Sequence, residues 1–256
     1  MYKKNYLTGT EQNIWQYIND KEMLDNELIS QIFPEMSENK RNKTLHSLYK
    51  KGYLKRARKD LYYNPEKLNS FYKLALKIRE GYIGLSSALR YYNLIEYEDY
   101  TIFIMTKSYQ KKMPLKGTQY QLCYIPLKEF FTGFEKKENI QISSVEKTLF
   151  DCFLKPSYIG FTNIAKVLYD AKMDWKRFME FFKLTNNNSL CQRTGYILDM
   201  MKKETKLAVP DFVFKMLLKH VQNPVKLMSL NTKSVFNKKW KIQDNLGKEK
   251  ILSWWY

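Results

Sequence analysis

The sequence has little cysteine. Its three cysteines, Cys123, Cys152 and Cys191, lie far apart and form no CxxC pair, so the spacing argues against a zinc site. A sparse, odd number of cysteines is also untypical of a disulfide scaffold and favours a reducing compartment. No apolar run approaches the roughly 18 residues that span a bilayer, and mean hydropathy is −0.54. The polar start, Met1–Tyr6, has no apolar core of a signal peptide. We therefore expect a cytoplasmic protein without membrane contact.

The usual catalytic motifs are also missing. The chain contains no P-loop, GxGxxG, HExxH or GxSxG. Of its two histidines, His220 has no neighbouring carboxylate or cysteine in sequence, and His46 lies in a basic stretch. The densest acidic group, Glu96, Glu98 and Asp99, follows no nucleotidyltransferase signature. We expect no catalytic residue, metal or cofactor, although these three acids remain candidates for a nucleic-acid-processing enzyme.

Positive charge is abundant and unevenly distributed. The 256 residues include 44 Lys and Arg against 26 Asp and Glu, a net charge of +18. A codon bias toward Lys, Asn, Tyr and Ile could raise the total, but it would not concentrate the charge. Residues 37–60 hold nine basic and two acidic side chains, a net charge of +7. This concentration indicates an anionic partner, and double-stranded DNA is the usual one.

The first 68 residues have the element order of a winged helix-turn-helix. Thr8 and Glu11 have the spacing of a capping box and predict a first helix to about residue 19. Asp25 begins a second helix that Pro34 ends, because the residue before proline disfavours helical geometry. A third helix runs from Ser37 to the glycine at 52. Residues 53–63 then read as two short strands joined by a basic turn.

The third helix of such a domain enters the major groove, and the hairpin flanks it. Amide and amine side chains can bind base edges, while lysine and arginine bind phosphates. The predicted DNA-binding residues are Asn39, Lys40, Asn42, Lys43, Ser47, Lys50, Lys51, Arg56, Arg58 and Lys59. Arg41 falls at a helix position that should be half buried, so either its stem extends to a phosphate or the helix phase is off by one. The alternative is a protein-docking module with a solvated basic face.

The remaining chain is predicted to be a connecting helix (69–80) followed by a larger α+β domain (81–256). Runs rich in β-formers predict strands at 101–106, 120–125 and 139–142, and strand-like alternation returns at 225–230 and 239–244. Helical periodicity predicts helices at 86–92, from 144, and at about 160–170, 174–184, 188–203 and 210–221. A small sheet with several helices is an α+β, or mixed α/β, arrangement.

Five segments in order resemble the AbiEi family of antitoxins and transcriptional regulators. They are a wing with Gly52, Leu54, Arg56 and Tyr62; Gly84–Leu89 with Asn93 and Leu94; Ser143–Asp151; Gln192–Asp199; and Val225–Leu230 with Trp240, Ile242 and Asn245. Two positions depart from the family pattern: Val145 stands where proline is frequent, and Asp60 stands where a wing glycine is common. These departures concern the wing geometry and operator sequence more than the family.

The resemblance implies the antitoxin of a type IV toxin–antitoxin system. The N-terminal domain would repress its own operon by binding promoter repeats. The C-terminal domain would neutralise a nucleotidyltransferase toxin, and the resemblance does not require a stable complex between the two proteins. Glu146, Asp151, Arg193 and Tyr196 match family positions, and each could instead be structural. A winged-helix transcriptional regulator without a toxin partner is the alternative, with a second domain that senses or dimerises.

Overall fold

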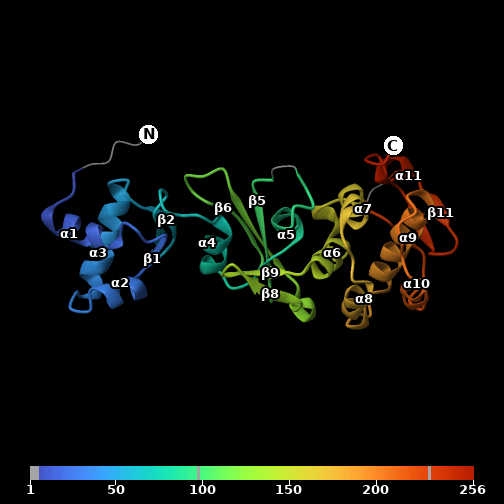
Figure 1. The fold of residues 1–256 in the computed structure, drawn as a ribbon, viewed down its shortest axis with the longest axis horizontal. Helices are drawn as coiled ribbons and strands as arrows, with labels where there is room; N and C mark the ends of the chain where they lie inside the picture. Colours follow the sequence, from blue (N-terminus) through green and yellow to red (C-terminus); the bar gives the residue numbers. More distant parts are fainter. Residues whose placement is uncertain (1–5, 97–98, 230–231) are drawn as a thin grey trace.

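The computed structural model describes residues 6–96, 99–229 and 232–256. These residues form an α+β protein whose three parts follow one another along its longest axis (Figure 1). The N-terminal unit (residues 7–63) contains α1 (Gly9–Ile18), β1 (Met23–Asp25), α2 (Asn26–Ile32), α3 (Glu38–Lys50), β2 (Lys55–Arg58) and β3 (Leu61–Tyr63).

Local signals set most boundaries of the N-terminal unit. Both hydrogen bonds of the capping box join Thr8 and Glu11 at the start of α1, and the Asp25 carboxylate accepts from the Leu28 N–H at the start of α2. The three predicted helices and the two predicted strands are confirmed. Asp60 has a φ of 60° in the β2–β3 turn, so aspartate takes the left-handed conformation for which glycine is common.

One strand of this unit was not predicted. The three residues of β1 pair antiparallel with β3, and the sheet order is β1-β3-β2. A three-residue strand is too short to show alternation in sequence.

The central part is a six-stranded mixed sheet with the order β6-β7-β5-β4-β9-β8. It is preceded by α4 (Phe71–Ile78), and α5 (Leu85–Tyr91) follows its first strand. The strands are β4 (Tyr82–Ile83), β5 (Thr101–Thr106), β6 (Lys111–Pro114), β7 (Gln121–Pro126), β8 (Phe134–Lys137) and β9 (Ile140–Ser143). The β5–β7 and β4–β9 pairs are parallel. The predicted strands correspond to β5, β7 and β9, whereas β4, β6 and β8 were not predicted.

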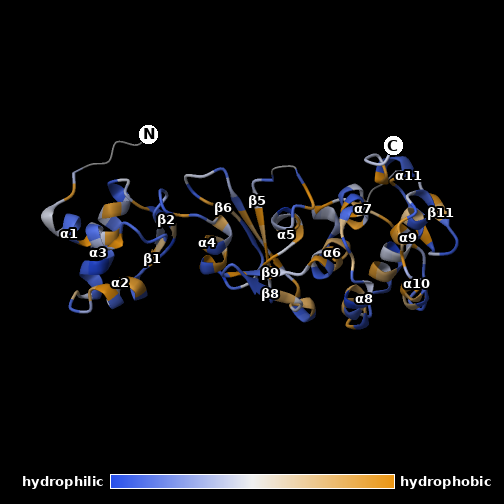
Figure 2. Ribbon diagram, viewed as in Figure 1, coloured by the Kyte–Doolittle hydropathy of each residue, from blue (hydrophilic) through white to orange (hydrophobic). Residues whose placement is uncertain are grey.

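The composition of each strand matches its place in the sheet. Ile102 and Ile104 of β5 pack on one face, with α4, while Phe103 and Met105 pack on the other, with α5. Burial on both faces explains why β5 is a continuous apolar run. Both edge strands instead carry adjacent lysines, which discourage pairing with another chain. Figure 2 shows the contrast between hydrophobic β5 and hydrophilic β6.

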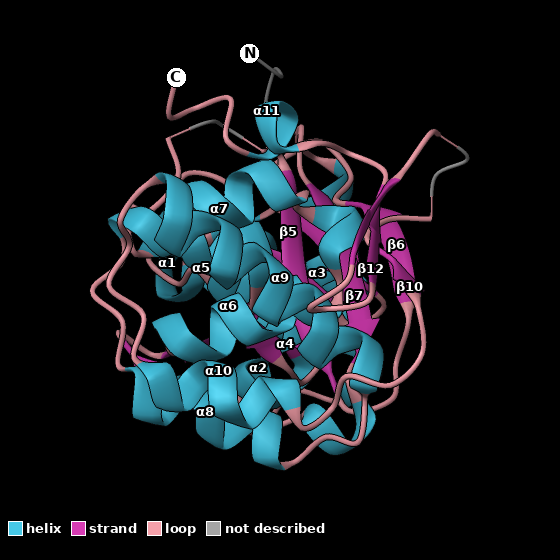
Figure 3. Cartoon of the chain, turned by 90° about the vertical axis from the view of Figure 1, so that its right-hand side faces the viewer, coloured by secondary structure: helices cyan, strands magenta, loops and turns pink. Residues whose placement is uncertain are grey.

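The C-terminal part (residues 144–256) is mainly helical (Figure 3). It contains α6 (Val145–Leu154), α7 (Phe161–Asp170), α8 (Trp175–Lys183), α9 (Asn188–Glu204), α10 (Asp211–Leu218), α11 (Lys248–Ile251), β10 (Val225–Lys226), β11 (Val235–Asn237) and β12 (Ile242–Asp244). A short 3₁₀ helix, η2 (Pro156–Tyr158), follows α6, and another, η1 (Lys128–Phe130), lies between β7 and β8 of the central part. The predicted strands at 225–230 and 239–244 overlap β10 and β12, and Leu230 lies outside the described residues.

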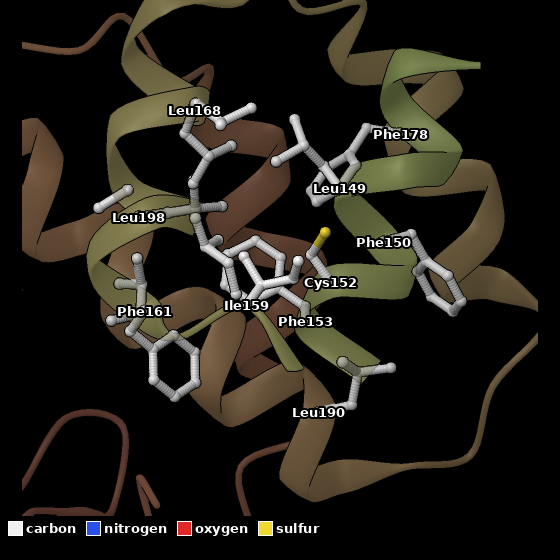
Figure 4. Packing of buried hydrophobic residues seen from close by; sticks show 14 of the residues in the cluster. Leu149, Phe150, Cys152, Phe153, Ile159, Phe161, Leu168, Phe178, Leu190 and Leu198 are labelled. Carbon is white, nitrogen blue, oxygen red and sulfur yellow. The ribbon is translucent and has the colours of Figure 1, made fainter. Parts of the chain in front are cut away.

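Helix α6 connects this part to the sheet. Its apolar side chains pack among those of α7, α8 and α9, as Leu149 and Phe153 show in Figure 4. The same apolar core includes Tyr82 and Met105 from the central sheet. All three cysteines are buried free thiols, and burial raises the pKa of Cys152. The central and C-terminal parts therefore share one core.

Strand β3 joins the N-terminal unit to the central sheet. Tyr62 packs into the core of the N-terminal unit, whereas Leu61 and Tyr63 pack with Leu74 of α4 and with the sheet. The Lys55 Nζ also donates to the Gly117 carbonyl, in the β6–β7 turn, at 2.5 Å. Consecutive residues of one strand thus belong to two cores, and the apolar packing crosses the predicted boundary at residue 68.

Replacement of Gly195 tests the packing of α9. A Cβ at this position would overlap the fully buried indole ring of Trp240. Alanine stabilises a helix interior by about 1 kcal/mol relative to glycine. Overpacking a core, however, costs about 1–3 kcal/mol and occasionally more. We expect Gly195→Ala to lower the free energy of unfolding in urea. Gly9→Ala is the matched control, because a Cβ there meets open space; an equal response of both variants would contradict the argument.

Candidate nucleic-acid interface

The solvent face of α3 carries basic and amide side chains. Asn39, Lys40, Lys43 and Lys50 are exposed and Asn42 is half-buried, while Leu45 and Leu48 on the opposite face are buried in the core. His46 is exposed beside Tyr49, with ring centroids 5.9 Å apart. The helix therefore presents donors and acceptors outward along one side, as base-edge and phosphate contacts require.

The β2–β3 hairpin adds further cations. Arg58 and Lys59 are exposed at its turn, where the Arg58 guanidinium donates to the Lys59 carbonyl at 3.3 Å. The half-buried Arg56 lies over the Tyr62 ring at 5.8 Å and donates to the Arg58 carbonyl at 3.3 Å. Each arginine still has N–H groups that bond to none of the described residues. Backbone carbonyls of the hairpin turn thus orient Arg56 and Arg58, whose remaining N–H groups can donate to a phosphate.

Two of the predicted DNA contacts are bonded inside the protein. The Glu11 carboxylate accepts from Ser47 Oγ and from Lys51 Nζ, each at 2.5 Å, and also from the Thr8 N–H at 2.7 Å. Hydrogen bonds from Lys51 and then Ser47 hold the pKa of Glu11 at about 2. These bonds tie α1 to the C-terminal half of α3. In this arrangement Ser47 and Lys51 orient α3, and the exposed residues of α3 and of the hairpin turn remain the accessible candidates.

Glu11 makes the stability of the N-terminal unit sensitive to acid. A carboxyl whose pKa is lowered on folding stabilises the protein above its unfolded pKa, and the stabilisation is lost as pH falls toward the folded value. For Glu11 this window runs from about 4.5 down to about 2. Glu11→Gln keeps the capping geometry but removes the charge, and we expect it to lower stability at pH 7 by about 1–2 kcal/mol. The difference from the wild type should shrink through this window in urea unfolding; a pH-independent difference would contradict the assignment.

Arg41 has a different place from the other basic residues of α3. Its Nε donates to the Asn26 side chain at 3.1 Å, and its guanidinium also donates to the Met36 carbonyl. The predicted helix phase is therefore right, and the half-buried Arg41 links α3 to α2 and to the segment between them.

The four family-motif residues all have partners within the described protein. Glu146, in the first turn of α6, lies 3.8 Å from Arg177 and accepts from the Asp174 N–H at 3.4 Å. Arg193 donates to the Lys226 carbonyl at 3.0 Å, and the Tyr196 hydroxyl donates to Asp244 at 2.7 Å. Burial raises the pKa of Tyr196. These contacts connect helices of the C-terminal part with each other and with its small sheet.

Asp151 belongs to a fully buried cluster. Lys147, one turn earlier on α6, forms an ion pair with Asp151, and both side chains have zero exposure. The Tyr82 hydroxyl donates to the second Asp151 oxygen at 2.8 Å. Burial raises the pKa of Asp151 and lowers that of Lys147, and each charge opposes the shift of the other. Lys147 is not among the site residues predicted from the sequence, although an i,i+4 Lys–Asp pair within an apolar helix is a usable signal.

The acidic candidates for catalysis do not form a described metal site. Asp99 accepts from Ser86 Oγ at 3.1 Å and from the Thr101 N–H at 2.8 Å. Glu96 is exposed, and Glu98 lies outside the described residues. Over residues 6–96, 99–229 and 232–256, no group of three or more His, Cys, Asp or Glu could hold a metal ion. Across the same ranges, no helix combines the length and the apolar character needed to cross a membrane.

A scan against protein-family models finds no match, and a search of curated proteins also finds none.

Proposed function

We propose that this protein is a DNA-binding antitoxin that represses its own operon. Its N-terminal unit would act as a winged helix-turn-helix, and its central and C-terminal parts would neutralise a nucleotidyltransferase toxin. The toxin component of this proposal comes from the five motifs that resemble AbiEi antitoxins.

The observation that favours DNA binding is the arrangement of the N-terminal unit. Three helices are followed by a two-stranded hairpin, and the exposed side of α3 and the hairpin turn both carry cations. In a helix-turn-helix the second of two packed helices lies in the major groove. Here Arg41 bonds α3 to α2, and the Glu11 network bonds α3 to α1, so the proposed recognition helix is fixed from both sides.

Binding to the DNA upstream of the gene tests this proposal. The purified full chain is titrated with that DNA and with a scrambled duplex across a salt series. Phosphate contacts weaken with salt for any sequence, whereas base contacts favour one sequence at every salt concentration. We expect tighter binding to the upstream DNA that persists as salt rises. Equal, steeply salt-dependent binding to both duplexes would contradict a specific repressor.

The alternative is a regulator of the same architecture without a toxin. Co-expression with the product of an adjacent nucleotidyltransferase reading frame separates the two hypotheses. Rescue of growth supports the antitoxin, whereas specific promoter binding without rescue favours the regulator.

A further inference from the structure

A pocket opens beside the junction of the N-terminal unit and the central sheet. Its volume is about 390 Å³, within the range of small-molecule sites. It lies where β5 and β7 begin, next to the first turn of α4 and the end of α5. The lining residues used below are Phe71, Arg90, Asp99, Tyr100, Gln119 and Tyr120.

Aromatic rings form much of the wall. The Phe71 and Tyr120 ring centroids are 4.5 Å apart, and those of Tyr100 and Tyr120 are 6.0 Å apart in an edge arrangement. Tyr100 is 42% exposed, and the other two rings are half-buried. A planar conjugated ligand can stack on the face of one such partly exposed ring and meet the neighbouring ring at an edge.

The charged groups of the pocket offset each other. The Arg90 guanidinium donates to the carbonyls of Asp99 and Thr101, the latter at 3.1 Å. The Asp99 carboxylate accepts from Ser86 and from the Thr101 N–H. One cation and one anion, both fixed by internal hydrogen bonds, give the described residues of the lining no net charge that would select a phosphate.

Gln119 supplies a polar group that is available to a ligand. Its side chain is exposed and makes no hydrogen bond to the residues that the structure describes. A glutamine amide offers a donor and an acceptor side by side, which match the edge of a nucleobase. Gln119 is two residues from Gly117, whose carbonyl accepts from Lys55 of β2. The turn that carries Gln119 is thus hydrogen-bonded to the basic hairpin.

We propose that this pocket binds a nucleobase, stacked on Tyr100, meeting Tyr120 at an edge and hydrogen-bonded by Gln119. The base can come from a free nucleoside or from an unpaired nucleotide of a strand held by the basic surface. The nucleoside case does not depend on promoter recognition, so it can succeed or fail separately from the proposed function.

Calorimetric titration of the full chain tests the proposal. The probes are adenosine, guanosine, cytidine and thymidine, with ribose and inorganic phosphate as negative probes. A second series uses a short single-stranded oligonucleotide and a duplex of the same sequence. The key variant combines Tyr100→Ala with Gln119→Ala, and Tyr256→Ala is the matched control because Tyr256 is exposed elsewhere on the chain. Tyr100→Phe keeps the ring and should keep the affinity.

We expect at least one nucleoside to bind, and the double variant to weaken it at least about fivefold, as loss of one stacking contact does. Absence of nucleoside binding, together with oligonucleotide binding that weakens only in the double variant, supports the unpaired nucleotide as the source. The proposal is overturned if the double variant binds every probe as the wild type does, or if ribose or phosphate binds as well as the nucleosides. Circular dichroism confirms that the variants fold.

Discussion

Replacement of Asp151 by alanine is expected to lower the free energy of unfolding by about 3–5 kcal/mol, the cost of removing one partner of a buried ion pair. The change removes the carboxylate that pairs with the Lys147 amine. The amine then remains buried among Phe150, Phe181 and Tyr82, whose rings lie 5.0–5.8 Å from Nζ. It also takes away the acceptor of the Tyr82 hydroxyl, which is buried in the same cluster. Urea unfolding followed by far-ultraviolet circular dichroism measures the loss.

A double variant and a surface control distinguish the effect of the buried ion pair on stability from the effect of packing around it. Lys147→Met combined with Asp151→Leu fills the site with apolar groups, and such replacements of buried pairs are often neutral or stabilising. Glu180→Ala breaks the exposed Lys183–Glu180 pair, whose side chains are more than half exposed, and should change stability by less than about 0.5 kcal/mol. If Asp151→Ala behaves like Glu180→Ala, the cluster contributes nothing specific to the fold.

Removal of four cations from the candidate interface is expected to abolish binding to the upstream DNA. The variant replaces Lys40, Lys43, Arg56 and Arg58 with alanine. Each lost phosphate contact reduces the slope of log affinity against log salt by about 0.9. Versions with one or two substitutions should therefore show progressively shallower salt dependence before binding disappears. The proposed neutralisation of a toxin should survive in the quadruple variant, because these residues lie in the N-terminal unit.

A variant that loses four positive charges from the C-terminal part provides the control. Lys172, Lys176, Lys219 and Lys250 are exposed in the C-terminal part, and their replacement by alanine lowers the net charge by the same amount. We expect this variant to bind the upstream DNA nearly as the wild type does. Similar losses in both variants would mean that bulk charge, and not the surface of α3 and the hairpin, governs binding.

Structural features that depend only on residues close together in the chain could be predicted from the sequence. The caps at Thr8 and Asp25 join groups three residues apart, so their spacing is visible in the chain. The apolar run of β5 also predicts a strand without knowledge of its partners. The short strands β1 and β4 and the polar edge strand β6 have no such internal signal, because only their pairing partners define them.

The candidate site shows the same division. The exposed cations of α3 followed from helical periodicity. The Ser47 and Lys51 bonds to Glu11 join residues 36 and 40 positions apart, and Tyr82 contacts Asp151 across 69 positions. Periodicity cannot show which residues of the preceding chain meet a helix, so a side chain already engaged inside the protein looked available in sequence.

The division of β3 between two cores also restricts how this protein can evolve. A recombination event that moved the first 68 residues to another gene would remove Leu61 and Tyr63 from Leu74 and the central sheet, and leave apolar surface on both fragments. Exchange of the N-terminal unit as a module is therefore costly. A new specificity of the proposed DNA-binding surface would arise by point substitution on the exposed side of α3, where residues can change without disturbing either core.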